Sequence, residues 1–128
     1  MAQEWGRNES KRTWRLHICT ELVDEVVIHS VSGRIGHASA RAMAEAIEGS
    51  SRPRRVVVDL SGVDYVSSAG VDVLATAAKR CEAGGGILVL SALTDPVRLA
   101  LDLAGLVCEL PIETTLDAAV ARARAHGR

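Results

Sequence analysis

Residues 54–74 read RRVVVDLSGVDYVSSAGVDVL, and this segment constrains the fold more than any other. A short β-branched apolar run followed by polar residues is typical of a strand buried on both faces. A polar, glycine-containing loop is expected next, at residues 59–64. Ser67 and Ser68 then precede apolar residues at helical spacing, where an N-cap serine belongs. The segment therefore predicts a strand, a loop and a helix whose N-terminus can accept an anion.

Before this segment, the pattern predicts an antiparallel hairpin and one helix. Partial alternation of apolar and polar residues indicates half-buried strands, and acidic residues between them indicate the turn. Ser39 is a candidate N-cap for the helix that follows. The expected elements are strands at 14–22 and 26–31, a turn at 24–25, a loop at 32–37 and a helix at 39–47.

After this segment, helices and strands alternate. The helix that begins after Ser68 has an apolar stripe at helical spacing and ends at the glycines 84–86. Pro96 suits the first turn of a further helix, which Gly105 should end. The other expected elements are strands at 87–90 and 107–110 and a last helix beginning near Thr115. The order ββαβαβαβα predicts the α/β class, with a largely parallel sheet after the hairpin.

The length of 128 residues fits one domain with a core of its own. Only Trp5, Trp14 and Tyr65 are aromatic, so the core must consist of Val, Leu, Ile and Ala. The polar residues 1–13 are expected to form a flexible tail, followed by a single domain over residues 14–128.

Charge and hydropathy patterns argue against several classes of function. A net charge of −1 does not provide the basic face that a nucleic-acid-binding protein needs. No apolar run has the length of a membrane span, and the N-terminus lacks the apolar region of a signal peptide. We therefore expect a cytoplasmic protein that inserts into no membrane.

Motifs for metal binding and catalysis are absent from the sequence. Cys19, Cys81 and Cys108 are far apart and form no C-x-x-C pair, and the histidines show no metal spacing. The glycines 84–86 are not followed by the Lys-Ser/Thr of a P-loop. Ser68 lacks the G-x-S-x-G elbow of a serine hydrolase, so an enzyme with Ser68 as nucleophile is disfavoured. We expect no metal, no cofactor and no catalytic residue.

The run VVVDLSGVDYVSSAGV resembles the core signature of STAS domains, the family of anti-sigma-factor antagonists. The resemblance continues at residues 33–35, 95–106, 111–112 and 116–119. It implies a mixed sheet of four to five strands with about four helices packed mainly on one side. In that family the phosphorylated serine lies two residues before the turn glycine, which is Gly70 here, so Ser68 is the expected phosphorylation site. Ser67 is the second candidate, at a position where family members often carry Asp.

The resemblance also implies a function and partners. The chain would bind an anti-sigma factor with serine-kinase activity, phosphorylation of Ser68 would switch this binding off, and a serine phosphatase would restore it. Sigma-factor-dependent transcription would thereby be regulated. The residues expected to bind the partner are Gly33, Arg34, Asp59, Ser61, Gly62, Asp64, Ser67, Ser68, Ala69, Gly70 and Asp72.

A phosphate on Ser68 would add about −1.5 to −2 charge, and desolvating this charge would penalise a tightly packed partner. Gly70 is expected to keep the surface flat where the partner approaches. Two other interpretations remain open from the residues alone. Ser68 could act only as an N-cap, a role worth about 1 kcal/mol. The chain could also be a STAS adaptor subunit of a lipid-type ABC transporter that binds its ATPase constitutively.

Overall fold

The computed structural model describes residues 16–49 and 55–127, and its elements follow the predicted order. The expected tail at 1–13 lies outside the described residues. The elements are β1 (His17–Val23), β2 (Val26–Ile35), α2 (His37–Gly49), β3 (Arg55–Val66), α3 (Ser68–Ala83), β4 (Ile87–Ser91), α4 (Asp95–Leu103), β5 (Ile112–Glu113) and α5 (Leu116–Ala125).

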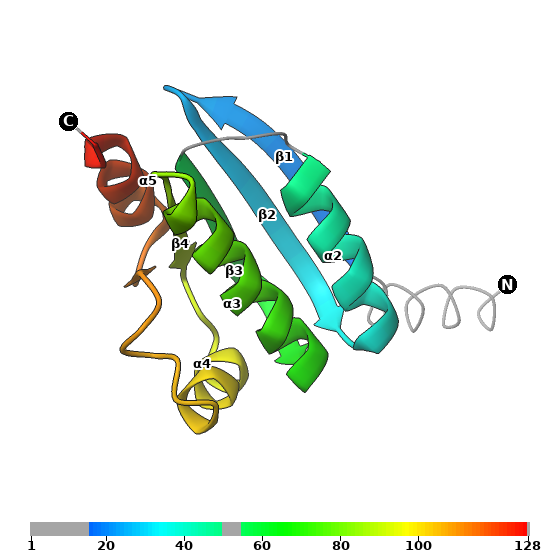
Figure 1. Ribbon diagram of the computed structural model, residues 1–128. Coiled ribbons are helices and arrows are strands. Elements are labelled where there is room, and N and C mark those ends of the chain that lie inside the picture. The colour runs from blue at the N-terminus through cyan, green and yellow to red at the C-terminus, as the bar shows by residue number, and fades with distance from the viewer. Residues whose placement is uncertain (1–15, 50–54, 128) are drawn as a thin grey trace, which may run out of the picture.

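The strands form one sheet in the order β1-β2-β3-β4-β5 (Figure 1). β1 and β2 pair antiparallel, and every later pair in the sheet is parallel. The predicted hairpin and parallel βα units are thus confirmed. Because β2, β3 and β4 run in the same direction, their carboxyl ends meet at one end of the sheet.

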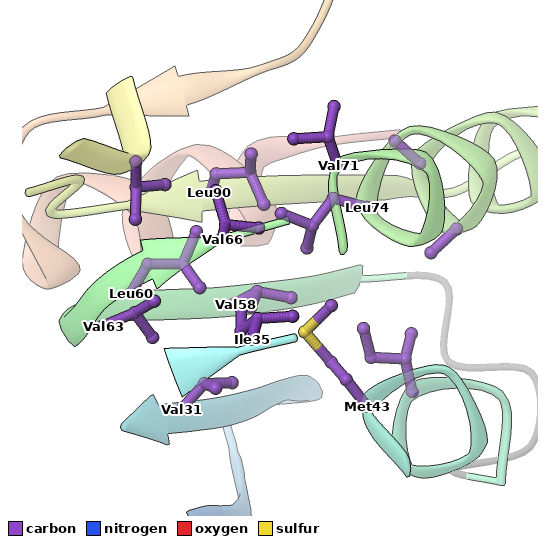
Figure 2. Packing of buried hydrophobic residues seen from close by; sticks show 14 of the residues in the cluster. Val31, Ile35, Met43, Val58, Leu60, Val63, Val66, Val71, Leu74 and Leu90 are labelled. Carbon is purple, nitrogen blue, oxygen red and sulfur yellow. The ribbon is translucent and has the colours of Figure 1, made fainter. Parts of the chain in front are cut away.

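Successive valines of β3 point to opposite faces of the sheet, as the period of a strand requires. Val56 and Val58 join the larger core, which packs under α2, α3 and α4, whereas Val57 joins a smaller cluster under α5. Figure 2 shows Met43 of α2 and Leu74 of α3 pointing into the larger core. Three helices on one face and α5 on the other agree with the expectation of helices mainly on one side.

β2 and β3 are longer than predicted. The expected loops at 32–37 and 59–64 are wrong, because Ser32 to Ile35 and Asp59 to Asp64 continue the two strands. Register shifts between Ser30 and Ser32 and between Gly33 and Arg34 mark irregularities in their pairing. Such bulges let polar and glycine residues remain paired between the two strands, where the alternation of apolar and polar residues would predict that the strands end. The extension carries both strands to the start of α3.

The start of the first predicted helix also differs. α2 begins at His37, so Ser39 lies within its first turn and is not the N-cap. Its hydroxyl accepts a hydrogen bond from the Gly36 N–H at 2.8 Å and donates to the Arg34 carbonyl at 3.0 Å. Ser39 therefore ties the end of β2 to α2 from inside the helix, as the third residue of a capping box does.

The last predicted strand, at 107–110, is wrong as well. These residues form turns in which the Leu110 N–H donates to the Leu106 carbonyl, and the strand lies at Ile112–Glu113. Pro111 has no N–H but its carbonyl accepts from the Leu90 N–H, so pairing with β4 starts there. The apolar side chains of the turns pack against the core instead.

Candidate functional site

The predicted site residues come from three segments that meet at the carboxyl ends of β2 and β3. Gly33 pairs with Val63 and Arg34 with Tyr65, which places Arg34 beside the end of β3. The Ser67 N–H donates to the Ile35 carbonyl at 2.7 Å and joins the start of α3 to the end of β2. The ends of β2 and β3 and the start of α3 thus meet near Ser68, whereas Asp59, which pairs with Ser30 and Ser91, lies further back along β3.

Ser67, not Ser68, caps α3. The Ser67 backbone is extended, and its hydroxyl oxygen accepts a hydrogen bond from the Gly70 N–H at 3.2 Å. Ser68 is the first helical residue, its side chain is exposed, and its hydroxyl forms no hydrogen bond with any described residue. The interpretation of Ser68 as a capping residue is therefore wrong. Its hydroxyl points to solvent beside the free N–H groups of a helix N-terminus.

Gly70 lies inside the structure, so the expectation that it keeps an exposed surface flat is wrong. A Cβ atom on Gly70 would lie 2.6 Å from Ile35 Cγ2 and 2.6 Å from Val66 Cγ2. Only glycine lets the first turn of α3 approach the ends of β2 and β3 this closely. With Gly70 facing inward, Ser68 lies on the outer side of the turn, which explains the spacing between the two residues.

The other predicted residues divide into an exposed and an inward-facing group. Ala69 is half-buried and packs against the larger core, and Asp59 is half-buried with its carboxylate accepting from the Ser61 N–H at 3.0 Å. Gly33 has a φ of 105°, which suits glycine. The exposed residues of the predicted set are Ser61, Gly62, Asp64, Ser68 and Asp72.

Asp64 and Asp72 lie four residues before and four residues after Ser68 in the sequence, in different electrostatic surroundings. Asp64 Oδ1 lies 3.5 Å from Arg34 Nε, and the Arg34 guanidinium also lies over the Tyr65 ring, 5.7 Å from its centroid. Asp72 follows Ser68 by four residues on α3, so the two share a helix face, and Asp72 forms no ion pair with a described residue. Negative charge added at Ser68 would be opposed mainly by Asp72.

Comparison with known proteins identifies the family of the chain. The family model described as the STAS domain matches residues 17–119. The chain belongs to the STAS domain family. It is 32% identical over 108 residues to BtrV, a candidate anti-sigma factor antagonist of Bordetella bronchiseptica, covering 83% of this chain and 93% of BtrV.

Solved structures show the same STAS fold. An anti-sigma factor antagonist from Mycobacterium paratuberculosis superposes with a TM-score of 0.79 at 30% identity, covering 86% of this chain and 95% of that one. The anti-sigma factor antagonist SpoIIAA in its unphosphorylated form gives 0.72 at 19% identity, covering 84% and 96%. The phosphorylated form of Bacillus SpoIIAA gives 0.65 at 17% identity, covering 83% and 98%. At these lower identities SpoIIAA shows the fold alone.

Two residues that were not predicted as site residues help to hold together the end of the sheet where Ser68 lies. Tyr65 is 43% exposed and supports the Arg34 guanidinium. Thr94 donates its hydroxyl to the Val63 carbonyl and fastens the start of α4 to β3. The pairing of Arg34 with Tyr65 depends on a register shift that the sequence does not reveal, and Thr94 has no motif around it.

The part of this STAS domain that the structure describes contains no cluster of three or more His, Cys, Asp or Glu residues suited to a metal ion. It also contains no helix with the length and apolar character that a membrane crossing requires. His29 is buried in β2 with its Nδ1 2.9 Å from Thr20 Oγ1. Burial lowers the pKa of His29.

Proposed function

We propose that this STAS domain is an anti-sigma factor antagonist that binds an anti-sigma factor through the surface around Ser68. In this proposal, phosphorylation of Ser68 abolishes the binding. The main observation behind the proposal is that Ser67 and Ser68 have different structural roles. Ser67 caps α3, whereas the Ser68 hydroxyl is exposed and has no hydrogen bond with the described residues, so it is available to a kinase.

The surroundings of Ser68 suit a binding switch more than a folding switch. Phosphorylation adds about −1.5 to −2 charge at neutral pH. The N-terminus of α3 stabilises this charge, whereas Asp72, one turn further on, repels it. These effects oppose each other, so the fold changes little in stability. A protein packed over Ser68 would have to exclude the hydration shell of a dianion, which weakens the complex strongly.

The partners follow from this scheme. The anti-sigma factor carries the serine-kinase activity and its nucleotide, and a serine phosphatase returns the domain to its binding form. The names of BtrV and of the Mycobacterium paratuberculosis protein support the anti-sigma assignment. The two forms of SpoIIAA support the idea that this fold can carry a phosphate.

A pull-down from the source cells tests the proposal. The baits are the wild-type chain, Ser68→Ala, Ser68→Asp and, as a matched control on the neighbouring serine, Ser67→Asp, which can still cap α3. We expect an anti-sigma kinase with wild type, Ser68→Ala and Ser67→Asp, and its loss with Ser68→Asp. Equal retention of a transporter ATPase by all four baits would instead show a constitutive adaptor and overturn the proposal.

A further inference from the structure

Helix α4 carries apolar side chains on two opposite faces. Val97 and Leu101 are fully buried against β3, whereas Leu99 is 57% exposed and Leu103 is 80% exposed. Leu99 and Leu103 are four residues apart and therefore adjoin on the helix surface. A single exposed leucine is ordinary, but a pair on one helix face is a candidate contact surface.

The exposed pair lies at the same end of the sheet as Ser68. The Thr94 hydroxyl, next to the start of α4, donates to the Val63 carbonyl near the end of β3. Figure 1 shows α4 beside the N-terminal end of α3, and α4 packs against both α3 and β3. α4 therefore lies at the same end of the sheet as Ser68.

The distribution of exposed apolar side chains favours one partner for both features. Among the described residues, the exposed large hydrophobics are Leu22, Val23, Tyr65, Leu99 and Leu103. Tyr65 lies near the end of β3, three residues before Ser68, so three of these side chains lie at the Ser68 end of the sheet. Leu22 and Val23 lie at the β1–β2 turn, which is the opposite end of the sheet because β2 starts there.

Charges on α4 indicate what the partner presents. Asp95, Leu99 and Leu103 follow one another at intervals of four residues, and Asp102 adjoins Leu99 at an interval of three. Asp95, Asp102 and the oppositely charged Arg98 are exposed and form no ion pair with a described residue, so the exposed charges of α4 leave an excess of negative charge. A complementary surface would therefore have an apolar recess with lysine or arginine at its rim.

We infer that the anti-sigma factor that binds the Ser68 surface also binds α4, with Leu99 and Leu103 seated in an apolar recess bordered by basic residues. The inference rests on the proposed function and adds a second anchor to it. The anchor lies on a different helix from Ser68, so it contributes to affinity in both phosphorylation states, whereas Ser68 decides between the states.

Calorimetric titration of the chain with the anti-sigma kinase recovered in the pull-down tests this inference. The variants are the double substitution Leu99→Ala/Leu103→Ala, the phosphate mimic Ser68→Asp, and Leu22→Ala as a matched exposed leucine at the opposite end. We expect the double variant to bind about 30-fold more weakly, as loss of a hot spot does, and Leu22→Ala to bind within about twofold of wild type. Thermal unfolding should be unchanged, because both replaced leucines are exposed.

Three other outcomes would contradict either the α4 anchor or the proposed function, and they can be told apart. If Ser68→Asp loses the kinase but the double variant keeps wild-type affinity, α4 is not an anchor and the phosphorylation switch stands. If Ser68→Asp binds as tightly as wild type, the proposed function itself is wrong. If light scattering shows a wild-type dimer that the double variant breaks, a second copy of this chain occupies α4 and the inference is wrong.

The basic rim has a test of its own. Asp95→Asn/Asp102→Asn removes both carboxylates and keeps their approximate size. We expect the association rate with the kinase to fall and to lose part of its dependence on salt, since rim charges act mainly on association. An unchanged association rate at low salt would contradict the basic rim.

Discussion

The Ser67 hydroxyl oxygen accepts a hydrogen bond from the Gly70 N–H at 3.2 Å, which makes Ser67 the N-cap of α3. Ser68, its neighbour, has no such role. The two adjacent serines should therefore respond differently to the same substitution.

We expect Ser67→Ala to lower the free energy of unfolding by about 1 kcal/mol, the usual cost of losing a cap, whereas Ser68→Ala should change it by less than about 0.5 kcal/mol. Ser67→Asp should keep most of the stability, because a carboxylate also caps a helix. Urea denaturation of the four proteins measures these differences. A loss for Ser68→Ala equal to that for Ser67→Ala would contradict the assignment of the cap.

Gly70 should tolerate no side chain. Alanine favours a helix interior over glycine by about 1 kcal/mol, yet a Cβ at Gly70 would lie 2.6 Å from methyl groups of Ile35 and Val66. We expect Gly70→Ala to destabilise the fold by about 1–3 kcal/mol, because overpacking outweighs propensity. Gly84→Ala, at the other end of α3, is the matched control, since its Cβ would lie 3.6 Å from the nearest atom. Equal effects in chemical denaturation would show that packing at Gly70 is not tight.

The β1–β2 turn stores backbone strain. Asp24 and Glu25 have φ values of 49° and 68°, a conformation that glycine adopts more readily. Glu25→Gly should raise the melting temperature, because relief of this strain outweighs the loss of the ion pair in which the exposed Glu25 carboxylate lies 3.8 Å from the Arg55 guanidinium. Glu25→Gln, which removes the ion pair and keeps the side chain, should leave the melting temperature nearly unchanged. Destabilisation by Glu25→Gly would contradict this account.

His29 should make stability depend on pH. Burial lowers its pKa below the ordinary value of 6.5, so in mildly acidic solution the unfolded chain binds a proton that the folded chain does not. The free energy of unfolding should therefore fall as pH decreases from 6.5 to the lower pKa of the folded state, by at most about 1.4 kcal/mol per pH unit. Denaturation of wild type and His29→Gln across this range measures the effect. An equal slope in both proteins would assign it to other groups.

Most of the fold can be predicted from the spacing of apolar residues in the sequence, because the buried valines of the strands and the apolar stripes of the helices form the core. The order of elements and the stripe of α3 are examples. The lengths of β2 and β3 cannot be predicted in this way, since the two strands stay paired through bulges that interrupt the alternation of apolar and polar residues. The run at 107–110 has the composition of a strand, but its turns satisfy the backbone locally and pairing with β4 starts at Pro111.

The site was predictable in its position and not in its details. The Ser-Ser pair before a helical pattern locates the start of α3, yet only the structure shows which serine caps the helix. Capping depends on the backbone angles of one residue, and a shift by one position is beyond what helical spacing can resolve. The inward position of Gly70 depends on contacts with Ile35 and Val66, which come from other strands.

The central claim is that a phosphate on Ser68 prevents binding of the anti-sigma factor. The most direct measurement is a titration of the anti-sigma kinase with the chain before and after phosphorylation, with modification of Ser68 alone verified by mass spectrometry. The account predicts that the phosphorylated chain binds at least about 100-fold more weakly, since a desolvated charge without a partner costs several kcal/mol. An affinity within about twofold of the unmodified chain would contradict it.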